Sequence, residues 1–313
     1  MSYFQNAIES EFSETFSYLY KFAYSASRRY KTYSIPKRTS GNRIISQPSR
    51  ELKSYQRYII SSILEQFPIH ESVYSYQNNK NIKKMATNHL NSRFLLRVDF
   101  SNFFPSIKGE YLREFFQKNM HFLENPLTDT DITLINLFVF RSNKLTIGAP
   151  SSPIISNIIL YDLDEYLSNI CTKKRVTYTR YADDLYFSTS EPNTLNEILQ
   201  LLKEYLKDFF IKLLVNEDKN IFTSKKRRRQ ITGLTLTTSN SISIGKKKKR
   251  EIRTLIYKYS TNNIELNELS YLKGYLPYLY SIEPSYIDNL KRKYSDKIIQ
   301  ELLPLKQSNI PIK

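Results

Sequence analysis

Hydrophobic positions repeat along the chain with two different spacings, and each spacing predicts a different kind of element. Apolar side chains three or four positions apart predict a helix over residues 1–30. The positions concerned are Phe4, Ile8, Phe12, Phe16, Leu19 and Phe22. The same spacing predicts helices over 52–67 (before Pro68), 108–121, 129–140, 151–170 and 193–210, and basic helices over 246–303.

Other stretches alternate apolar and polar residues, which is typical of strands. Residues 31–49 predict a hairpin around the turn Thr-Ser-Gly-Asn, and 229–245 predict a second hairpin. Strands are also predicted over 93–104 and 213–216, and a strand–turn–strand unit over 175–190. Paired strands separated by helices indicate an α+β fold.

Two neighbouring aspartates interrupt an apolar and aromatic run in "TYTRYADDLYFS", residues 177–188. Burying one bare carboxylate is costly, and burying two is more so. Successive strand residues point to opposite faces, so Asp183 and Asp184 can serve one site only if the chain turns there. We therefore expect a hairpin with the acids at its tip. The alternative is a solvated turn that carries two acids by accident.

A third acid, Asp99, lies near the end of the predicted strand over 93–104. The alternation puts Leu95, Arg97 and Asp99 on one face and Phe94, Leu96 and Val98 on the other. Three carboxylates brought together repel one another unless divalent cations neutralise them, and carboxylate oxygens suit Mg²⁺. Two such ions, roughly 3.5–4 Å apart, can activate an attacking oxygen and stabilise a leaving one in phosphoryl transfer. The sequence thus predicts these three acids as catalytic metal ligands.

The charge balance indicates a polyanionic partner. The 313 residues include 47 Lys and Arg against 30 Asp and Glu, a net charge of +17. The basic residues are clustered, as in "KKRRR" (225–229) and "KKKKR" (246–250). Release of counterions from phosphates favours nucleic acid as the partner, ahead of a membrane surface. The alternative is a merely soluble basic protein.

Other classes of site are excluded or disfavoured by composition. The single cysteine, Cys171, excludes a disulfide framework and a Cys-rich zinc site. The three histidines, His70, His89 and His121, show no ligand spacing. No uncharged run reaches the length of a membrane span, and the acidic N-terminal segment does not resemble a signal peptide, so we expect a cytoplasmic protein.

Several blocks resemble, in order and spacing, those of bacterial retron reverse transcriptases. "YADD" between apolar strands is similar to the polymerase signature of this family, and "RVDFSNFFPSI" to the block with the first catalytic aspartate. "RIISQPSRELKSYQRYI", "GAPSSPIISNIIL" and "VNEDKNIF" resemble further polymerase blocks, and "RRRQITGLTL" and "MATNH" resemble retron-specific motifs. The likeness covers about residues 30–300. Two departures are Ile147, where the family usually has Gln, and Met85, where it has Asn.

The resemblance implies a set of nucleotide-binding residues. An aromatic side chain at Phe104, five residues after Asp99, would exclude a ribose 2′-hydroxyl, although core packing is the alternative. Gly148, Ala149 and Pro150 would line the template and the incoming base. Lys37 and Arg43 could clamp the triphosphate. Lys219 could donate a proton to pyrophosphate or stabilise its charge; for each of these three basic residues simple solvation is the alternative.

RNA contacts are implied by the retron-specific motifs and by the basic C-terminal part. The candidates are His89, Thr232, Gly233, Lys246, Lys247, Lys248, Lys249 and Arg250. His89 could instead be a structural histidine, and the basic run could be a solvated face. Interleaved with Tyr257, Tyr259 and Tyr271, the basic residues favour a segment that grips phosphates.

The resemblance implies a right-hand polymerase with an antiparallel palm sheet. We expect an N-terminal helical segment (1–30), fingers (31–92 and 105–145), a palm (93–104 and 146–245) and a helical thumb (246–313). The implied activity is RNA-directed DNA synthesis from dNTPs, self-primed from a 2′-hydroxyl of a structured noncoding RNA. The product would be a stable RNA-linked DNA, in antiphage defence with a separate effector protein.

Three alternatives stay open at this stage. The first is another bacterial reverse transcriptase, such as a group II intron maturase. The second is a nonenzymatic RNA-binding scaffold with a polymerase-like palm, which the intact Asp99, Asp183 and Asp184 disfavour. The third is a metal nuclease, for which neither an aromatic residue at the sugar nor so large a basic segment is needed.

Overall fold

The computed structural model describes residues 2–37 and 41–303, and these form two compact units. The first unit comprises residues up to 76, 97–187 and 193–220. The second comprises 77–96, 188–192 and the chain from 221 onward. None of the helices in the described part of the chain combines the length and the apolar character that crossing a bilayer requires.

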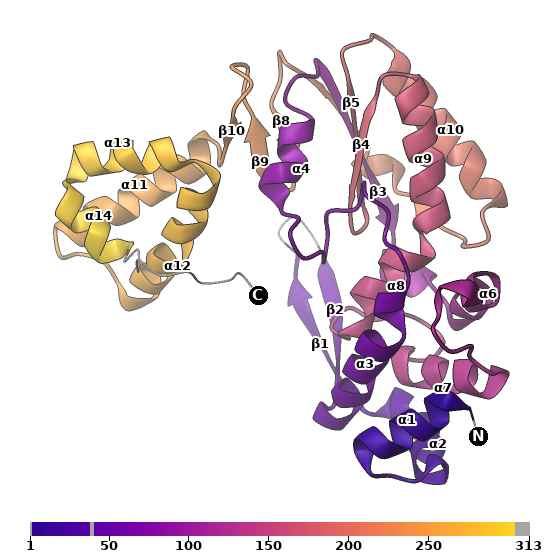
Figure 1. Cartoon of the computed structure of the whole chain (residues 1–313). Helices are drawn as coiled ribbons and strands as arrows, with labels where there is room; N and C mark the ends of the chain where they lie inside the picture. Colours follow the sequence, from indigo (N-terminus) through magenta and orange to yellow (C-terminus); the bar gives the residue numbers. More distant parts are fainter. Residues whose placement is uncertain (1, 38–40, 304–313) are drawn as a thin grey trace. The chain divides into compact units, whose positions relative to one another are not determined.

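The N-terminal part of the first unit is a layer of short helices. The predicted helix over 1–30 is two helices, α1 (Tyr3–Phe12) and α2 (Phe16–Ser25), because Ser13 adopts a left-handed backbone (φ 52°) that ends α1. Helix α3 (Arg50–Ser62) and the short η2 (Leu64–Gln66) occupy the predicted 52–67 region. Helices α2, α3 and α6 (Gly109–Asn119) all pack against α7 (Asp129–Val139), which is the common partner in this layer (Figure 1).

The predicted first hairpin is confirmed. Strands β1 (Tyr30–Pro36) and β2 (Asn42–Pro48) pair antiparallel, with Tyr30 opposite Pro48 and Pro36 opposite Asn42. Thr39 and Ser40 of the predicted turn lie outside the described residues.

A sheet with the order β4–β5–β3–β6 carries the acidic residues. Its strands are β3 (Phe94–Ser101), β4 (Thr177–Tyr181), β5 (Asp184–Thr189) and β6 (Leu214–Val215), and β7 (Ile221–Ser224) also pairs with β3. Residues of both predicted faces of β3 are buried. Leu95, Leu96, Val98, Asp99 and Phe100 are all buried, because β3 is a central strand covered on both faces.

Three helices lie next to the sheet strands in the sequence. The predicted helix over 151–170 is α8 (Ser151–Ile159) followed by α9 (Tyr161–Lys173), and the helical geometry is interrupted at Leu160. Helix α10 (Thr194–Asp208) lies beside α9, which contacts β4 (Figure 1). Short turns at η1 (Ala26–Arg28), η3 (Met120–Phe122) and η4 (Glu217–Lys219), and the one-turn helix α5 (Phe103–Ser106), complete this unit.

The second unit combines a small sheet with a helical bundle. Helix α4 (Ile82–Asn88) packs on the three-stranded sheet of β8 (Arg229–Ile231), β9 (Leu234–Leu236) and β10 (Ile242–Ser243), which contains the predicted second hairpin. The basic helices are α11 (Lys246–Ser260), α12 (Leu266–Ile282), α13 (Pro284–Tyr294) and α14 (Asp296–Leu302). These helices pack against one another (Figure 1), and their buried residues are leucine and isoleucine.

Candidate active site

The hairpin of β4 and β5 brings the neighbouring aspartates to a tight turn, as predicted. Only Ala182 and Asp183 separate the two strands, and Asp184 is the first residue of β5. The backbone N–H of Phe100 donates to the carbonyl of Asp183 (3.2 Å), so the turn is fixed beside the part of β3 that holds Asp99. The three acids therefore belong to one region of the sheet.

Asp183 is the carboxylate most affected by its surroundings. Burial, together with repulsion from Asp184 and Asp99, raises the pKa of Asp183 to about 6. Burial also raises the pKa of Asp184, although its contact with Arg97 opposes this effect. A nearby positive charge stabilises the ionised form of each carboxylate in a cluster of this kind.

Asp184 is held by a residue to which the sequence assigned no role. The guanidinium of Arg97 donates from Nε (2.9 Å) and Nη2 (2.8 Å) to one carboxylate oxygen of Asp184. The hydroxyl of Tyr186 donates to the other oxygen (3.3 Å). Arg97 is two residues before Asp99 on β3, and this i, i+2 spacing on one face was the signal that could have revealed it.

Asp99 is buried and pairs with Lys219. Strand β6 pairs with the end of β3, and the chain that follows it turns back past Asp99. The N–H of Asn216 donates to the Asp99 carbonyl (2.8 Å), and Lys219 Nζ donates to Asp99 Oδ1 (2.9 Å). The exposed Lys219 thus lies at the acids, where the resemblance implied a proton donor.

The donor set fits divalent cations in chemistry and in charge. Within residues 2–37 and 41–303, no three His, Cys, Asp or Glu side chains converge closely enough to form a ready-made ion cage. Instead, Arg97 pairs with Asp184 and Lys219 pairs with Asp99, while burial and the two neighbouring acids raise the pKa of Asp183. Carboxylate oxygens and uncompensated negative charge are what a hard cation requires, so the residues fit such an ion.

The phenylalanines after β3 have different surroundings. Asn102 adopts a left-handed backbone (φ 48°), so the chain leaves the strand at once and forms α5. Phe103 is buried and stacks on Phe100 (6.0 Å between ring centroids). Phe104 is half-buried and contacts Phe103 edge-on (5.3 Å). Phe104 is therefore partly exposed to solvent, whereas Phe103 is not.

The Gly148–Pro150 loop packs against the first hairpin. The Ile147 carbonyl accepts from the N–H of Ser46 (2.8 Å). Gly148 has φ 114°, and a Cβ there would lie 3.0 Å from the Ser46 carbonyl, so the position requires glycine. Ala149 is buried, whereas Gly148 is exposed and Pro150 is half-buried.

Of the two basic residues on the hairpin, Arg43 shares a neighbour, Tyr76, with Asp183. The charges of Asp183 and Arg43 both act on the Tyr76 hydroxyl: burial and repulsion by Tyr181 and Asp183 raise the Tyr76 pKa, and Arg43 lowers it. Lys37 is exposed at the turn end of the hairpin, and its N–H donates to the Gly41 carbonyl (2.9 Å). Within the described part of the chain, Lys37 makes no contact with Asp99, Asp183 or Asp184.

Comparison with known proteins identifies the family. Residues 35–257 match the family "Reverse transcriptase (RNA-dependent DNA polymerase)". The chain belongs to the reverse transcriptase family. It is 37% identical to the Retron Ec83 reverse transcriptase of Escherichia coli over 282 residues, which are 87% of this chain and 89% of that protein. It is 30% identical to the Retron Ec73 reverse transcriptase of the same species over 278 residues, 86% of this chain and 88% of that protein.

A solved structure shows the same fold. The telomerase from Candida albicans, in complex with a fragment of telomeric RNA, superposes with a TM-score of 0.51 at 15% identity, over 97% of this chain and 66% of that one. The predicted right-hand polymerase fold is confirmed, and so is the predicted relation to bacterial retron reverse transcriptases. The protein is an RNA-directed DNA polymerase.

The residues of this reverse transcriptase that the sequence predicts as RNA contacts have three different kinds of surroundings. His89 is completely buried and hydrogen-bonded to Ser188 Oγ (2.7 Å), a placement in which its ring cannot touch RNA. Burial and the charge of Arg229 lower the pKa of His89 to about 3, so the ring is neutral. The structural alternative therefore describes His89, and Met85, one helical turn earlier, is also buried.

Thr232 and Gly233 form the turn between β8 and β9, with φ 45° and φ 88°. Gly233 is exposed there, and no atom lies within 4 Å of the place that a Cβ would occupy. On α11 of the reverse transcriptase, Lys246, Lys247 and Arg250 are exposed, whereas Lys248 and Lys249 are half-buried. Lys248 donates to Glu251 (2.8 Å) and to the Tyr271 hydroxyl (2.7 Å), and Lys249 pairs with Glu283.

Proposed function

We propose that this reverse transcriptase copies part of a structured noncoding RNA into single-stranded DNA that stays linked to the RNA. Synthesis would start from a 2′-hydroxyl of that RNA and use dNTPs. The observation that carries the proposal is that Asp99, Asp183 and Asp184 lie at one turn of the palm sheet, where burial and the two neighbouring acids raise the pKa of Asp183, in a chain that is 37% identical to a retron reverse transcriptase.

Asp99, Asp183 and Asp184 are proposed to hold two divalent cations, with Mg²⁺ as the physiological ion. When bound, such ions increase the reactivity of the attacking hydroxyl and offset the charge that develops on the phosphates. Arg97 holds Asp184 through two hydrogen bonds, whereas Asp99 accepts one from the exposed Lys219, so Asp99 and Asp183 are the principal ligands in this proposal.

The remaining residues bind and orient the nucleotide. Arg43, whose charge acts on the same Tyr76 hydroxyl as that of Asp183, is proposed to neutralise the triphosphate, and Lys37 is a second candidate. The half-buried ring of Phe104 excludes a 2′-hydroxyl, and Gly148–Pro150 allow a base to approach the backbone. The Lys219 ammonium, which donates to Asp99, is proposed to donate a proton to departing pyrophosphate.

The proposed parts of the hand are fingers (31–92 and 105–145), palm (93–104 and 146–245) and thumb (246–313). The relation to retron proteins also supports a cytoplasmic role in antiphage defence with a separate effector protein. These assignments rest on the family relationship, and on the exposed basic residues of α11 for RNA binding.

The direct test is incorporation of labelled dNTP on an RNA template by the Asp183→Asn variant. Asn keeps the shape of the side chain but loses the charge, so incorporation should fall by a factor on the order of 10³ or more while RNA binding persists. Extension close to the wild-type rate would contradict the metal assignment. Cleavage of labelled nucleic acid without incorporation would favour the nuclease alternative.

A further inference from the structure

The turn that presents Asp183 has an unfavourable backbone conformation. Ala182 has φ 54°, in the left-handed region that residues with a Cβ rarely adopt. Such a conformation persists only where the surrounding structure enforces it. The contacts of Ala182 therefore decide the direction in which the next residue, Asp183, points.

Both backbone polar groups of Ala182 are bound by buried side chains. Its N–H donates to Ser75 Oγ (2.9 Å), and its carbonyl accepts from Nη1 of Arg180 (3.2 Å). Ser75 and Arg180 have no exposed surface. Solvent therefore cannot replace either partner without rearrangement, and loss of one would leave a backbone group unsatisfied.

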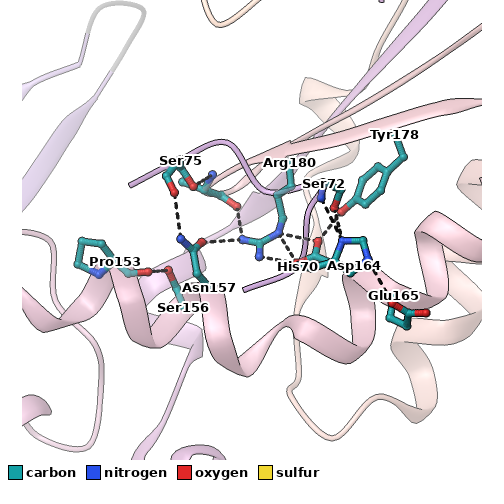
Figure 2. Close-up of polar contacts among 11 residues, drawn as sticks. His70, Ser72, Ser75, Pro153, Ser156, Asn157, Asp164, Glu165, Tyr178 and Arg180 are labelled. Atoms are coloured by element: carbon teal, nitrogen blue, oxygen red, sulfur yellow. Dashed lines mark hydrogen bonds and ion pairs between the residues drawn. The ribbon is translucent and has the colours of Figure 1, made fainter. Parts of the chain in front are cut away.

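Arg180 is itself fixed by an ion pair in the interior. Its guanidinium donates from Nε (2.8 Å) and Nη2 (2.6 Å) to the two oxygens of Asp164, which is also completely buried. The Tyr178 hydroxyl donates to the same carboxylate (2.7 Å). Figure 2 shows this arrangement between β4 and α9.

Asn157 of α8 connects the two partners of Ala182. Its Nδ2 donates to the Ser75 carbonyl (3.0 Å), and its Oδ1 accepts from Nη1 of Arg180 (3.4 Å) (Figure 2). Helix α8 begins directly after Gly148–Pro150, the loop assigned to the template and the incoming base. The side chain of Asn157 thus joins the helix behind that loop to the turn of the acids.

Ser75 is presented by a segment that extends the sheet. The N–H of Arg180 donates to the Ser72 carbonyl (2.9 Å), and the N–H of Tyr74 donates to the Arg180 carbonyl (2.9 Å), so Val73 pairs in parallel with Arg180. His70 accepts from the Ser72 N–H through Nδ1 (3.1 Å), and its Nε2 lies 3.2 Å from a carboxylate oxygen of Glu165. The segment that carries Ser75 is therefore held by both β4 and α9.

We propose that Ser75, Asn157 and Arg180 are positioning residues that hold Ala182 in its left-handed conformation and thereby aim the Asp183 carboxylate at the bound cation. This inference rests on the proposed role of Asp183 as a metal ligand. Its consequence is a metal site whose geometry is set before the cation arrives. Loss of the Ser75 hydroxyl should then weaken metal binding more than it slows the reaction at saturating metal.

The experiment titrates the full-length protein with Mn²⁺ by electron paramagnetic resonance, and measures dNTP incorporation against Mn²⁺ concentration. Ser75→Ala should raise the Mn²⁺ Kd by roughly three- to tenfold, as expected from one lost hydrogen bond to a buried N–H. The rate at saturating Mn²⁺ should stay within about twofold of wild type. Ser75→Thr keeps the acceptor and should restore the Kd, whereas Asn157→Ala should raise it by a smaller factor than Ser75→Ala.

Ser156→Ala is the matched control. Ser156 lies on α8 and is as completely buried as Ser75, but its hydroxyl donates to the Pro153 carbonyl (2.8 Å) and has no hydrogen bond to Ala182 (Figure 2). It should bind Mn²⁺ as wild type does. Asp183→Asn is the reference for a lost ligand. If Asp183→Asn loses Mn²⁺ but Ser75→Ala retains the wild-type Kd, or if Ser75→Ala and Ser156→Ala shift equally, the positioning role is overturned. If Asp183→Asn binds Mn²⁺ normally, the metal assignment fails and the inference fails with it.

Discussion

At the scale of single residues, the adjacent Phe103 and Phe104 show how neighbours of one type take different roles. Phe103 is 4% exposed and stacks on Phe100, so it belongs to the core. Phe104 is half-buried, five residues after Asp99, at the position where the family excludes a ribose. The sequence allowed both roles for Phe104, and the different exposure of the two rings favours the sugar contact.

We expect Phe104→Ala to lower the preference for dNTP over rNTP by at least about tenfold, because a removed ring leaves room for the 2′-hydroxyl. Competition between the two nucleotides in single-turnover incorporation would measure this ratio. Phe103→Ala is the control: it should lower the unfolding midpoint by creating a cavity, without a change in the ratio. An unaltered ratio in Phe104→Ala would assign this ring to packing as well.

His89 gives a prediction for stability against pH. Its pKa is about 3 in the folded protein, below the value of about 6.5 for an unperturbed histidine. The unfolded chain therefore takes up a proton that the folded one does not. The neutral ring's contribution is fully present above about pH 6.5 and is lost as the pH falls toward 3.

His89→Gln should therefore reduce the slope of unfolding free energy against pH by about 1.4 kcal/mol per pH unit between about pH 6 and 4. Urea unfolding at several pH values would measure the slope. His121→Gln is the control, because His121 is exposed on η3. Equal slopes in wild type and His89→Gln would mean that His89 is protonated in the folded state.

At the scale of elements, α11 has an unfavourable arrangement of charge at its start. Lys246, Lys247, Lys248 and Lys249 occupy the first turn, which contains no acidic residue, although the positive end of the helix dipole lies there. Lys248 and Lys249 are compensated by Glu251 and Glu283, and they lie over the rings of Tyr271 and Tyr286. Lys246 and Lys247 are exposed, which favours them as the residues that bind phosphates.

The run of lysines therefore divides into two pairs with different expected effects. Lys246→Ala/Lys247→Ala should reduce the slope of log Kd for RNA against log salt by about 0.7–0.9 for each phosphate that is no longer neutralised. Lys248→Ala/Lys249→Ala should leave the slope nearly unchanged but lower the thermal midpoint. Filter binding across salt concentrations, with thermal unfolding of each variant, separates the two. A larger slope change in the second pair would reverse the assignment.

Local patterns predicted most elements, and the exceptions have physical causes. The strand–turn–strand at the acids was predictable because apolar runs flank the two neighbouring aspartates, which can serve one site only if the chain turns there. The breaks at Ser13 and Leu160 were missed because the apolar spacing continues across them. The alternation of β3 did not indicate which residues are buried, because both of its faces are covered. The contacts of Ser75 with Ala182 and of Arg180 with Asp164 join residues 107 and 16 positions apart, and no local pattern encodes these contacts.

At the scale of the whole molecule, the segments that resemble retron-specific motifs lie in the same compact unit as the basic C-terminal helices. Helix α4, which contains most of "MATNH", packs on β8, β9 and β10, where "ITG" lies, and Lys83 of α4 donates to the Ser281 carbonyl of α12 (2.7 Å). The acids and the candidate nucleotide-binding residues lie in the other unit. This division suggests that choice of template and chemistry of copying depend on different parts of the chain.

We therefore predict that replacing residues 246–313 by the corresponding segment of a related retron reverse transcriptase separates the two functions. Extension of a primer already annealed to RNA should stay within about threefold of wild type, because the acids, Phe104 and Arg43 are unchanged. Self-primed synthesis on the native RNA should be lost, with preference moving toward the donor's RNA, because a folded RNA is recognised by shape, 2′-hydroxyls and stacked bases.

The control is a chimera that also carries the donor's residues 77–92, so that the α4 segment and the bundle it binds come from one source. If the first chimera self-primes on the native RNA as wild type does, template choice lies outside α11–α14. If only the control chimera accepts the donor's RNA, α4 and the bundle recognise it together.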